Sequence, residues 1–206
     1  MKKKKILGIT GIRSDYDILS SVFKEIEINP NLDLEIIVTG THLSDKHNHS
    51  ISEVERDGFR IVEKIDSFID SDSLEARVLG LAEQIKGITM RVKSSRPDIL
   101  LVLGDREESI ALSLVGSYMN IPIAHICGGD RVVGNVDDQI RHAVSKLSHL
   151  HFVSNQESYE RLIKMGEQKF RIFNVGNPGL DRLKETPEMS IHELNKNLSI
   201  DLNDDE

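Results

Sequence analysis

Short apolar runs rich in isoleucine, valine and leucine recur along the chain, and longer segments with helical periodicity separate them. Because the runs are apolar throughout and do not alternate with polar residues, they indicate parallel strands that are covered on both faces. A weaker run covers residues 59–65. Six clearer runs predict buried strands at residues 6–10, 34–40, 98–104, 122–127, 150–154 and 170–176.

The segments between these runs predict helices. One long helix carries a single apolar stripe formed by Leu74, Val78, Leu81, Ile85, Ile88 and Val92. Asp72 and Glu75 have the spacing of a capping box at its start, and Pro97 ends it. Other helices are predicted at residues 16–28, 50–57, 107–119, 137–148 and 155–165. This alternation predicts an α/β fold with a Rossmann-like doubly wound parallel sheet.

The pattern changes after Gly179, where the chain becomes polar and helical. We expect residues 1–183 to form a Rossmann-like domain and residues 184–206 to form a polar helical linker or tail. A complete second α/β domain does not fit in the residues that remain.

Composition restricts the classes of partner. The 206 residues carry a formal net charge of −8, which argues against a protein that binds nucleic-acid backbones. No run approaches the ~18 apolar residues that a membrane helix needs, and no secretory pattern follows the opening lysines. The one cysteine, Cys127, excludes an internal disulfide and a zinc site built from several cysteines. We therefore expect a cytoplasmic protein that binds neither nucleic acid nor membranes.

Polar residues and glycines follow the predicted strands. In an open α/β sheet, ligands bind outside the carboxyl ends of the strands, so these positions are the candidates for a site. The polar candidates after successive strands are Arg13, Ser14 and Asp15, then His42, then Asp105 and Arg106, then Asp130, and finally Asn177.

The stretch "GITGIRSDYD" follows the first strand but lacks the G-x-G-x-x-G spacing and the Walker lysine. Arg13 lies near a predicted helix N-terminus, where amide groups and the helix dipole favour an anion, and its guanidinium can grip a phosphate with two bonds. The alternative is an ordinary turn in which Ser14 or Asp15 caps the helix. The sequence does not separate these two interpretations.

Three acidic residues also have two interpretations each. Asp105 can cap the following helix, or it can bind a substrate hydroxyl or transfer a proton. Asp137 and Asp138 can be favourable first-turn charges that pair with Arg141 and His142 four residues later. Adjacent acids near another acidic loop can also hold different protonation states.

His149 and His151 alternate at a strand start and therefore share a face. We expect hydrogen-bonded histidines at these positions, because no further ligands accompany them to make a metal site. Cys127 can be an inert core residue, and a nucleophile is less favoured because nothing in the sequence fixes a base beside it.

Several motifs together resemble the UDP-N-acetylglucosamine 2-epimerase family, with the closer likeness to its hydrolysing type. The likeness extends to about Leu183, and the stretch from Asp137 to Phe152 is its most specific part. The motifs are "TGIRSDYD", "VTGTHLSDKH", "LVLGDREESIAL", "IPIAHICGGD", "VDDQIRHAVSKLSHLHF" and "NVGNPGLDRL".

This resemblance implies the N-terminal half of a glycosyltransferase-B-type fold, with the active site in the cleft between two Rossmann-like halves. It implies that UDP-N-acetylglucosamine loses UDP by elimination across C1 and C2, and that water then adds to give N-acetylmannosamine for sialic-acid-like sugar biosynthesis. It implies no metal and no nicotinamide cofactor, and it implies homo-oligomers that associate through the N-terminal domain.

The resemblance also suggests roles. Arg13 would contact the diphosphate, and Asp105 and Asp137 would be family acids. Relatives often carry an acid where this chain has Cys127, and Asp130 can substitute for it. The catalytic candidates are Asp105, Asp137, Asp138 and Cys127; the substrate-binding candidates are Arg13, Ser14, His42, Arg106, Asp130, Arg141, His149, His151 and Asn177; no metal ligand is expected.

Two alternatives remain open at this stage. One is the non-hydrolysing epimerase, which returns a nucleotide-linked epimer. The other is a catalytically silent domain that binds nucleotide sugars, which the cysteine at position 127 and the short chain favour.

Overall fold

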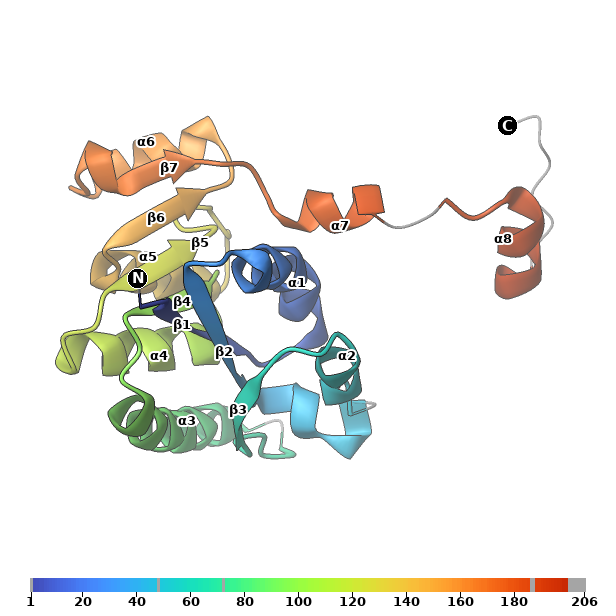
Figure 1. The fold of residues 1–206 in the computed structure, drawn as a ribbon, viewed down its shortest axis with the longest axis horizontal. Helices are drawn as coiled ribbons and strands as arrows, with labels where there is room; N and C mark the ends of the chain where they lie inside the picture. Colours follow the sequence, from blue (N-terminus) through green and yellow to red (C-terminus); the bar gives the residue numbers. More distant parts are fainter. Residues whose placement is uncertain (1, 48, 72, 186–187, 200–206) are drawn as a thin grey trace.

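The computed structural model describes residues 2–47, 49–71, 73–185 and 188–199. Its centre is a parallel sheet in the order β3-β2-β1-β4-β5-β6-β7 (Figure 1). All the predicted strands are confirmed, including the weaker run at residues 59–65. Their bounds are β1 Lys4–Thr10, β2 Leu32–Thr39, β3 Ile61–Ile65, β4 Ile99–Leu103, β5 Ile123–Ile126, β6 Leu150–Val153 and β7 Ile172–Asn174.

The predicted helices are confirmed as well. The α-helices are α1 Arg13–Ile28, α2 Ile51–Arg56, α3 Leu74–Ser95, α4 Glu107–Tyr118, α5 Asp137–Leu147, α6 Gln156–Lys164, α7 Gly179–Glu185 and α8 Ile191–Leu198. Short 3-10 helices are η1 Gly40–Leu43, η2 Asp45–His47 and η3 Lys169–Arg171. The fold class is therefore the predicted one, an α/β fold with a doubly wound parallel sheet.

The sheet reverses its strand order between β1 and β4. From β1 the chain moves outward through β2 to β3, and it then returns to place β4 on the other side of β1. Gly8 of β1 is in register with Ile36 of β2 and with Leu101 of β4. The loops after β1 and β4 diverge at this point, which opens a crevice at the carboxyl edge of the sheet.

Two apolar layers cover the sheet. On one face, Tyr16, Leu19 and Phe23 of α1 pack with strand residues such as Ile36 and Leu101. Phe23 lies so close to β1 that a Cβ on Gly8 would be 2.7 Å from its ring, so only glycine fits there. On the other face, α3, α4 and α5 contribute buried residues that include Ile88, Val92, Ala111, Leu112, Val115 and Val144.

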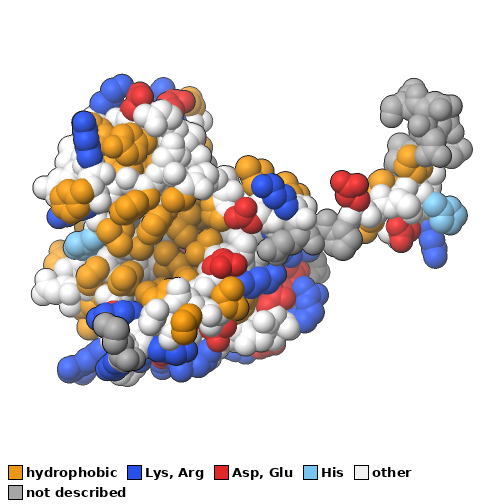
Figure 2. Space-filling view, turned by 45° about the horizontal axis from the view of Figure 1, so that its top comes forward, with side chains coloured by type: hydrophobic (Ala, Val, Ile, Leu, Met, Phe, Trp, Pro, Cys, Tyr) orange, Lys and Arg blue, Asp and Glu red, His pale blue; other side chains and the backbone are white. Residues whose placement is uncertain are grey.

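Part of the first face remains open. An apolar groove of about 420 Å³ lies between α1 and the strands β4 to β6, and Figure 2 shows the hydrophobic side chains gathered there. We expected strands covered on both faces. Among the described residues, α1 covers β1 and β2 and α7 packs on α1, whereas Leu101, Ile126 and Phe152 line the groove.

The start of α3 differs from the prediction. Its N-cap is Ser73, whose Oγ accepts a hydrogen bond from Ala76 N at 3.2 Å, so a capping box from Asp72 to Glu75 is wrong. Asp72 itself lies outside the described residues.

The buried face of α3 also differs in its first turns. Leu74 and Val78 of the predicted stripe are 82% and 66% exposed. The buried residues at these turns are Ala76, Gly80 and Gln84. A Cβ on Gly80 would be 2.5 Å from Ser67 O, so the helix approaches the loop after β3 by its backbone. Close backbone packing therefore rotated this part of the helix away from the apolar stripe.

The last two helices, α7 and α8, differ in how they contact the rest of the fold. In α7, Arg182 forms an ion pair with Asp17 of α1, and just before it Pro178 O accepts a hydrogen bond from Ser21 Oγ at 3.3 Å. In contrast, α8 has a capping box between Ser190 and Glu193 but no buried side chain, and it extends away from the sheet (Figure 1). Within the described part of the chain, no helix has the length and apolar character to cross a membrane.

Candidate active site

Two loops at the carboxyl edge of the sheet meet at one arginine of α5. Arg141 of α5 donates from Nη2 to Asp105 Oδ2 in the loop after β4, and its Nη1 lies 3.8 Å from Asp130 Oδ2 in the loop after β5. The side chains of Arg141 and Asp105 are each 14% exposed. In such partly desolvated surroundings a cation between two carboxylates offsets their repulsion. We call Asp105, Asp130 and Arg141 the carboxylate cluster.

Asp130 is held by hydroxyl groups from the neighbouring strand and helix. Ser154 Oγ, just after β6, donates to Asp130 Oδ1 at 2.6 Å, and Ser158 Oγ of α6 donates to the same oxygen. Arg161 of α6 donates to Gly129 O, which fixes the backbone next to Asp130. These contacts leave Asp130 in one orientation at the edge of the sheet.

His125 connects the loop that carries Asp105 with the helix that carries Arg141. It is fully buried in β5, and its Nε2 lies 2.8 Å from Gly104 O, while its Nδ1 lies 3.2 Å from Ser145 Oγ of α5. Burial is the main reason that its pKa falls to about 3, so the ring is neutral at physiological pH. A Cβ on Gly128 would be 2.7 Å from His125 Nδ1, which explains a glycine at this turn.

Asp15 and Arg106 extend the carboxylate cluster toward β1. We call the carboxylate cluster together with Gly11, Asp15, Arg106 and Glu108 the charged site. Burial raises the pKa of Asp15 to about 6, with a further rise from Asp105 and an opposing effect of Arg106. Such a carboxyl can hold or release a proton near neutral pH. Arg106 is the N-cap position of α4 and makes no side-chain cap there. Asp105 therefore does not cap α4, and its carboxylate pairs with Arg141 instead.

Glu108 is a charged residue that the sequence analysis missed. It is buried in the first turn of α4, and burial raises its pKa to about 7. Its carboxylate lies against Gly11, where a Cβ would be 2.5 Å from Oε1, and Oε1 lies 3.8 Å from Arg106 Nε. One signal could have found it: Glu108 precedes Ala111, Leu112 and Val115 at helical spacing and so belongs to the buried face of α4.

Asp137 and Asp138 begin α5, as the sequence predicted. Asp138 Oδ1 accepts a hydrogen bond from Val132 N at 2.9 Å and lies 3.9 Å from His142 Nε2, so the predicted pair with His142 is present. The predicted pair between Asp137 and Arg141 is wrong: Asp137 accepts from Asn135 Nδ2 at 2.7 Å, and Arg141 turns to Asp105.

Cys127 lies in the left-handed backbone region with a φ of 57° and is buried. Burial, with a smaller contribution from the nearby Asp130, raises the pKa of its thiol to about 12. A thiol in this state neither accepts nor releases a proton at neutral pH. Cys127 is therefore an uncharged side chain beside Asp130.

Arg13 pairs with Glu53 of α2, with Nε 3.0 Å from Oε1. The N-cap of α1 is Ile12, which makes no side-chain hydrogen bond, so neither Ser14 nor Asp15 caps this helix. Ser14 donates instead to Asp15 Oδ1 at 3.4 Å. The start of α1 therefore keeps uncapped amide groups near Arg13, which suits an anion.

Three histidines are placed by internal contacts. His42 is 0% exposed, and its two ring nitrogens lie 3.0 Å from Thr10 Oγ1 and 2.8 Å from Ser50 Oγ. His151 is also fully buried, with Nε2 3.3 Å from Glu167 Oε2. His149 is exposed and accepts from Ile123 N at 3.3 Å. His42 and His151 thus lack the accessible surface that a direct substrate contact requires, which corrects the prediction for both.

Asn177 caps the start of α7, since its Oδ1 accepts from Gly179 N at 2.9 Å. It follows the edge strand β7, and the chain directly after it packs on α1, where Pro178 O accepts a hydrogen bond from Ser21 Oγ. Among the described residues, no group of three or more histidine, cysteine or acidic residues has the arrangement of a metal site.

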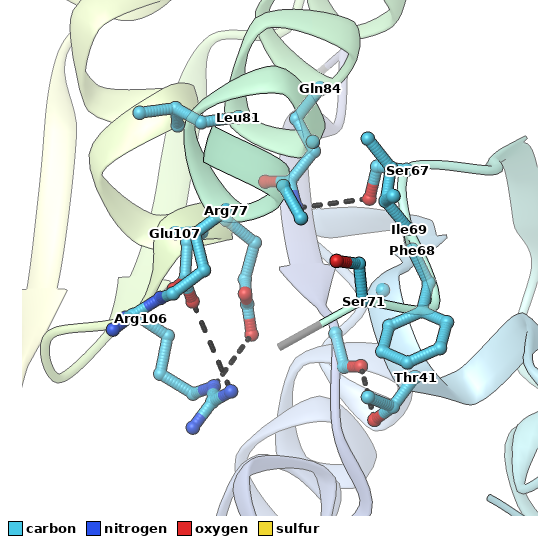
Figure 3. A pocket seen from close by; sticks show the side chains of 15 residues that line it. Thr41, Ser67, Phe68, Ile69, Ser71, Arg77, Leu81, Gln84, Arg106 and Glu107 are labelled. Atoms are coloured by element: carbon cyan, nitrogen blue, oxygen red, sulfur yellow. Dashed lines mark hydrogen bonds and ion pairs between the residues drawn. The ribbon is translucent and has the colours of Figure 1, made fainter. Parts of the chain in front are cut away.

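A side pocket of about 190 Å³ adjoins the charged site (Figure 3). Gly11, Arg106 and Glu108 belong to both. Figure 3 shows Thr41, Phe68, Ile69 and Ser71 on one wall, Arg77, Arg106 and Glu107 on the other, and Leu81 and Gln84 from α3 above them. The ion pair between Arg77 Nε and Glu107 Oε1, at 2.7 Å, forms part of the rim.

Comparison with known proteins gives the site a family context. A sequence model of the family described as UDP-N-acetylglucosamine 2-epimerase matches residues 24–205. The UDP-N,N'-diacetylbacillosamine 2-epimerase (hydrolyzing) of Legionella pneumophila is 38% identical over 182 residues, which cover 88% of this chain and 48% of the relative. The GDP/UDP-N,N'-diacetylbacillosamine 2-epimerase (hydrolyzing) of Campylobacter jejuni is 33% identical over 202 residues, which cover 98% and 52%.

The fold is shared with solved structures. The crystal structure of UDP-GlcNAc 2-epimerase from Neisseria meningitidis bound to UDP-GlcNAc matches with a TM-score of 0.77 and 22% identity, over 93% of this chain and 50% of that chain. The chain spans about half the length of the curated relatives it matches, and its fold is that of one Rossmann-like half of their glycosyltransferase-B-like architecture.

Proposed function

This chain belongs to the UDP-N-acetylglucosamine 2-epimerase family, and from that premise we propose that it carries the proton-transfer side of a hydrolysing UDP-2-acetamido-sugar 2-epimerase. The reaction begins when a carboxylate removes the proton on C2 and the bond between C1 and the diphosphate oxygen breaks. UDP leaves, and a glycal with a double bond between C1 and C2 remains. Water then adds across this double bond with a proton on the opposite face of C2, which gives the free 2-epimeric sugar.

One observation carries this proposal: Asp105, Asp130 and Arg141, from three separate elements, meet at the carboxyl edge of the sheet. Elimination followed by hydration needs two proton transfers at C2, and carboxylates held in fixed positions suit both. Arg141 keeps two carboxylates close without leaving a buried charge unpaired. Asp137 and Asp138, one turn before Arg141, remain proposed members of the site.

The leaving diphosphate needs positive charge. Arg106, surrounded by the carboxylates Asp15, Asp105 and Glu108, and Arg13 at the uncapped start of α1 are the proposed contacts. Ser14 belongs to the same helix start. With its pKa near 6, Asp15 is a further proton-holding group beside them. Cys127 takes no proton-transfer step, because its thiol stays protonated.

The relatives support the hydrolysing outcome, since the two described above are named as hydrolysing enzymes. The substrate class that fits both their names and the family is a UDP-linked sugar with an acetamido group on C2, and the product would feed the synthesis of sialic-acid-like sugars in the cytoplasm. We propose that residues 1–183 are the Rossmann-like domain and residues 184–206 a polar helical extension.

We also propose that copies of the protein associate through this domain. The exposed apolar side chains Leu74, Val78 and Leu79 on α3 support such a contact, since clustered exposed apolar residues are typical of interfaces.

The test uses protein expressed from its complete reading frame and the variant Asp105→Asn. With UDP-N-acetylglucosamine in D2O, we expect release of UDP and of free sugar with deuterium on C2. The variant should lower kcat by about 10²- to 10⁴-fold, as expected for loss of one proton-transfer group. Asp33→Asn is the matched control, because Asp33 lies at the amino end of β2 and pairs with Arg60 at 3.4 Å.

Two outcomes would change the assignment. A nucleotide-linked epimer in place of free sugar would identify the non-hydrolysing reaction. Folded protein that binds UDP-sugar without releasing UDP would identify a silent binding domain and contradict the proposal.

A further inference from the structure

The side pocket between α3 and the loop after β3 has the size of a substituent. Its volume of about 190 Å³ is below the ~300 Å³ at which pockets for whole ligands begin. It exceeds several times the ~30 Å³ that one water occupies in the liquid. Since Gly11, Arg106 and Glu108 lie in both the pocket and the charged site, a group on a bound sugar can enter the pocket from that site.

A chain of hydrogen bonds fixes the polar end of this pocket. Thr39 Oγ1 donates to Ile65 O at 2.8 Å, so Ser67 Oγ, 2.8 Å away, must donate to Thr39. The oxygen of Ser67 is then free to accept, and Gln84 Nε2 donates to it at 3.1 Å. This order determines which end of the Gln84 amide is nitrogen and which is oxygen.

This series of hydrogen bonds leaves one acceptor, Gln84 Oε1, without a donor. Gln84 is 4% exposed, and its Oε1 is buried with no hydrogen-bond partner. Buried polar atoms of this kind are rare because nearly all find a partner. Gln84 lines the pocket, and Figure 3 places its side chain above the cavity. An N–H donor inside the pocket would complete the chain.

The remaining lining is mostly apolar. Phe68, Ile69, Ala76 and Leu81 line the pocket, and among its described lining residues Arg77 pairs with Glu107 at the rim. The pocket thus suits a neutral group that combines one N–H donor with a methyl. Among substituents of amino sugars, an acetamido group has these features.

We propose that the side pocket binds an acetamido group of the nucleotide-sugar substrate other than the one on C2, with its N–H donating to Gln84 Oε1 and its methyl against Phe68 and Ile69. The inference rests on the proposed function. The acetamido group on C2 must stay with the reacting carbon near Asp105 and Asp130, under β4 to β6. The pocket lies on the opposite side of Arg106, toward β2 and β3, so it receives a different substituent.

Two relatives are named for substrates with two N-acetyl groups. The site would therefore prefer a UDP-linked diacetamido sugar to UDP-N-acetylglucosamine. In this chain the preference would come from Gln84, a polar residue in the buried face of a helix whose neighbours at the same spacing are apolar or small.

The test compares kcat/KM for UDP-N,N'-diacetylbacillosamine and UDP-N-acetylglucosamine in the wild type, Gln84→Leu and Gln156→Leu. We expect the wild type to favour the diacetamido sugar at least tenfold, and Gln84→Leu to lose about tenfold of this ratio, since a site built for a hydrogen bond rejects the group that cannot make it. Gln156→Leu is the control, because Gln156 lies on the exposed surface of α6, and it should keep the ratio.

A second variant tests the pocket independently, in case Gln84→Leu does not fold. Ile69 is 41% exposed, so Ile69→Trp should fold while it fills the pocket, and it should reduce the same ratio. In parallel, the side-chain amide resonance of Gln84 should shift on titration with the diacetamido nucleotide sugar and stay in place with UDP-N-acetylglucosamine.

The outcomes separate the two proposals. Equal ratios in the wild type and Gln84→Leu, or no shift of the Gln84 resonance with the diacetamido sugar, would overturn the pocket assignment while UDP release continued. Absence of UDP release from both sugars, with the Gln84 shift intact, would overturn the proposed reaction and leave the pocket assignment standing.

Discussion

Single side chains in this protein take their properties from neighbours that are distant in the sequence. Arg141 lies 36 positions from Asp105, yet it donates to that carboxylate and not to Asp137 on its own helix. In the sequence, Glu108 is one of two acids in the first turn of a helix, but in the structure its carboxylate is buried against Gly11. The same composition of acids and arginines would have little chemical use if each were solvated separately.

Glu108 provides a test at this scale. Burial raises its pKa to about 7, so the folded protein binds this proton more tightly than the unfolded chain, where glutamate titrates near ~4.3. Between those two values, stability falls as pH rises, and above pH 7 the full cost of the buried charge is present. Glu108→Gln should raise the free energy of unfolding at pH 8 by on the order of 2 kcal/mol, and change it little near pH 4.

Urea unfolding at the two pH values checks this prediction, with Glu107→Gln as the control. Burial acts to raise the pKa of Glu107, but a backbone hydrogen bond and the hydrogen bond from Arg77 outweigh it, so the net pKa is below the usual range. The control should therefore lose stability at pH 8 relative to pH 4. An equal effect of Glu108→Gln at both pH values would show that its charge is not buried.

At the scale of elements, α3 shows how packing overrides periodicity. Its apolar stripe is regular, but the first turns bury Ala76, Gly80 and Gln84 and expose Leu74 and Val78. The contact of Gly80 with Ser67 O sets this rotation. The same rotation produces both the side pocket and an apolar outer surface on the helix.

The cap of α3 is testable by itself. Ser73→Ala should lower the free energy of unfolding by about 1 kcal/mol, because the Ala76 amide would lose its side-chain partner. Glu75→Ala, which removes the acid of the expected capping box, should change stability by less than about 0.5 kcal/mol. Thermal unfolding of both variants measures the difference, and a larger loss for Glu75→Ala would restore the original prediction.

The outer surface of α3 gives a second prediction for this element. If copies associate there, Val78→Glu should shift the protein toward monomers, because a charge replaces an apolar side chain at the contact. Lys93→Glu, near the other end of the same helix, should leave the distribution unchanged. Sedimentation velocity distinguishes the species. An unchanged distribution for Val78→Glu would place any association elsewhere.

For the whole molecule, the reversal of strand order between β1 and β4 determines where chemistry can occur. The loops after β1, β4, β5 and β6 all end at one edge, and the carboxylate cluster, Arg106 and the side pocket lie there. The body of the fold ends with α7, which packs on α1, whereas α8 buries no side chain.

A truncation tests this division. A chain that ends at Glu185 should unfold at the same urea midpoint as the full chain within error, because the removed helix α8 has no buried side chain. A chain that ends at Pro178 also loses α7 and its Arg182 contact with Asp17, so its midpoint should fall. Loss of stability on removal of α8 alone would show that this helix packs against the body in solution.

By itself, the sequence determined the strands, the helices, the doubly wound class and the edge of the sheet at which Asp105 and Asp130 lie. These features follow from local periodicity and from the rule that parallel strands end together, so neighbouring residues suffice to predict them. Only the tertiary structure decided that Arg141 pairs with Asp105, that His42 and His151 are enclosed, and that the carboxylate of Glu108 and the amide of Gln84 lie beside the site. Burial and ion pairing depend on contacts between segments that are far apart along the chain, and no local pattern encodes the loss of water that shifts a pKa or leaves an oxygen without a partner.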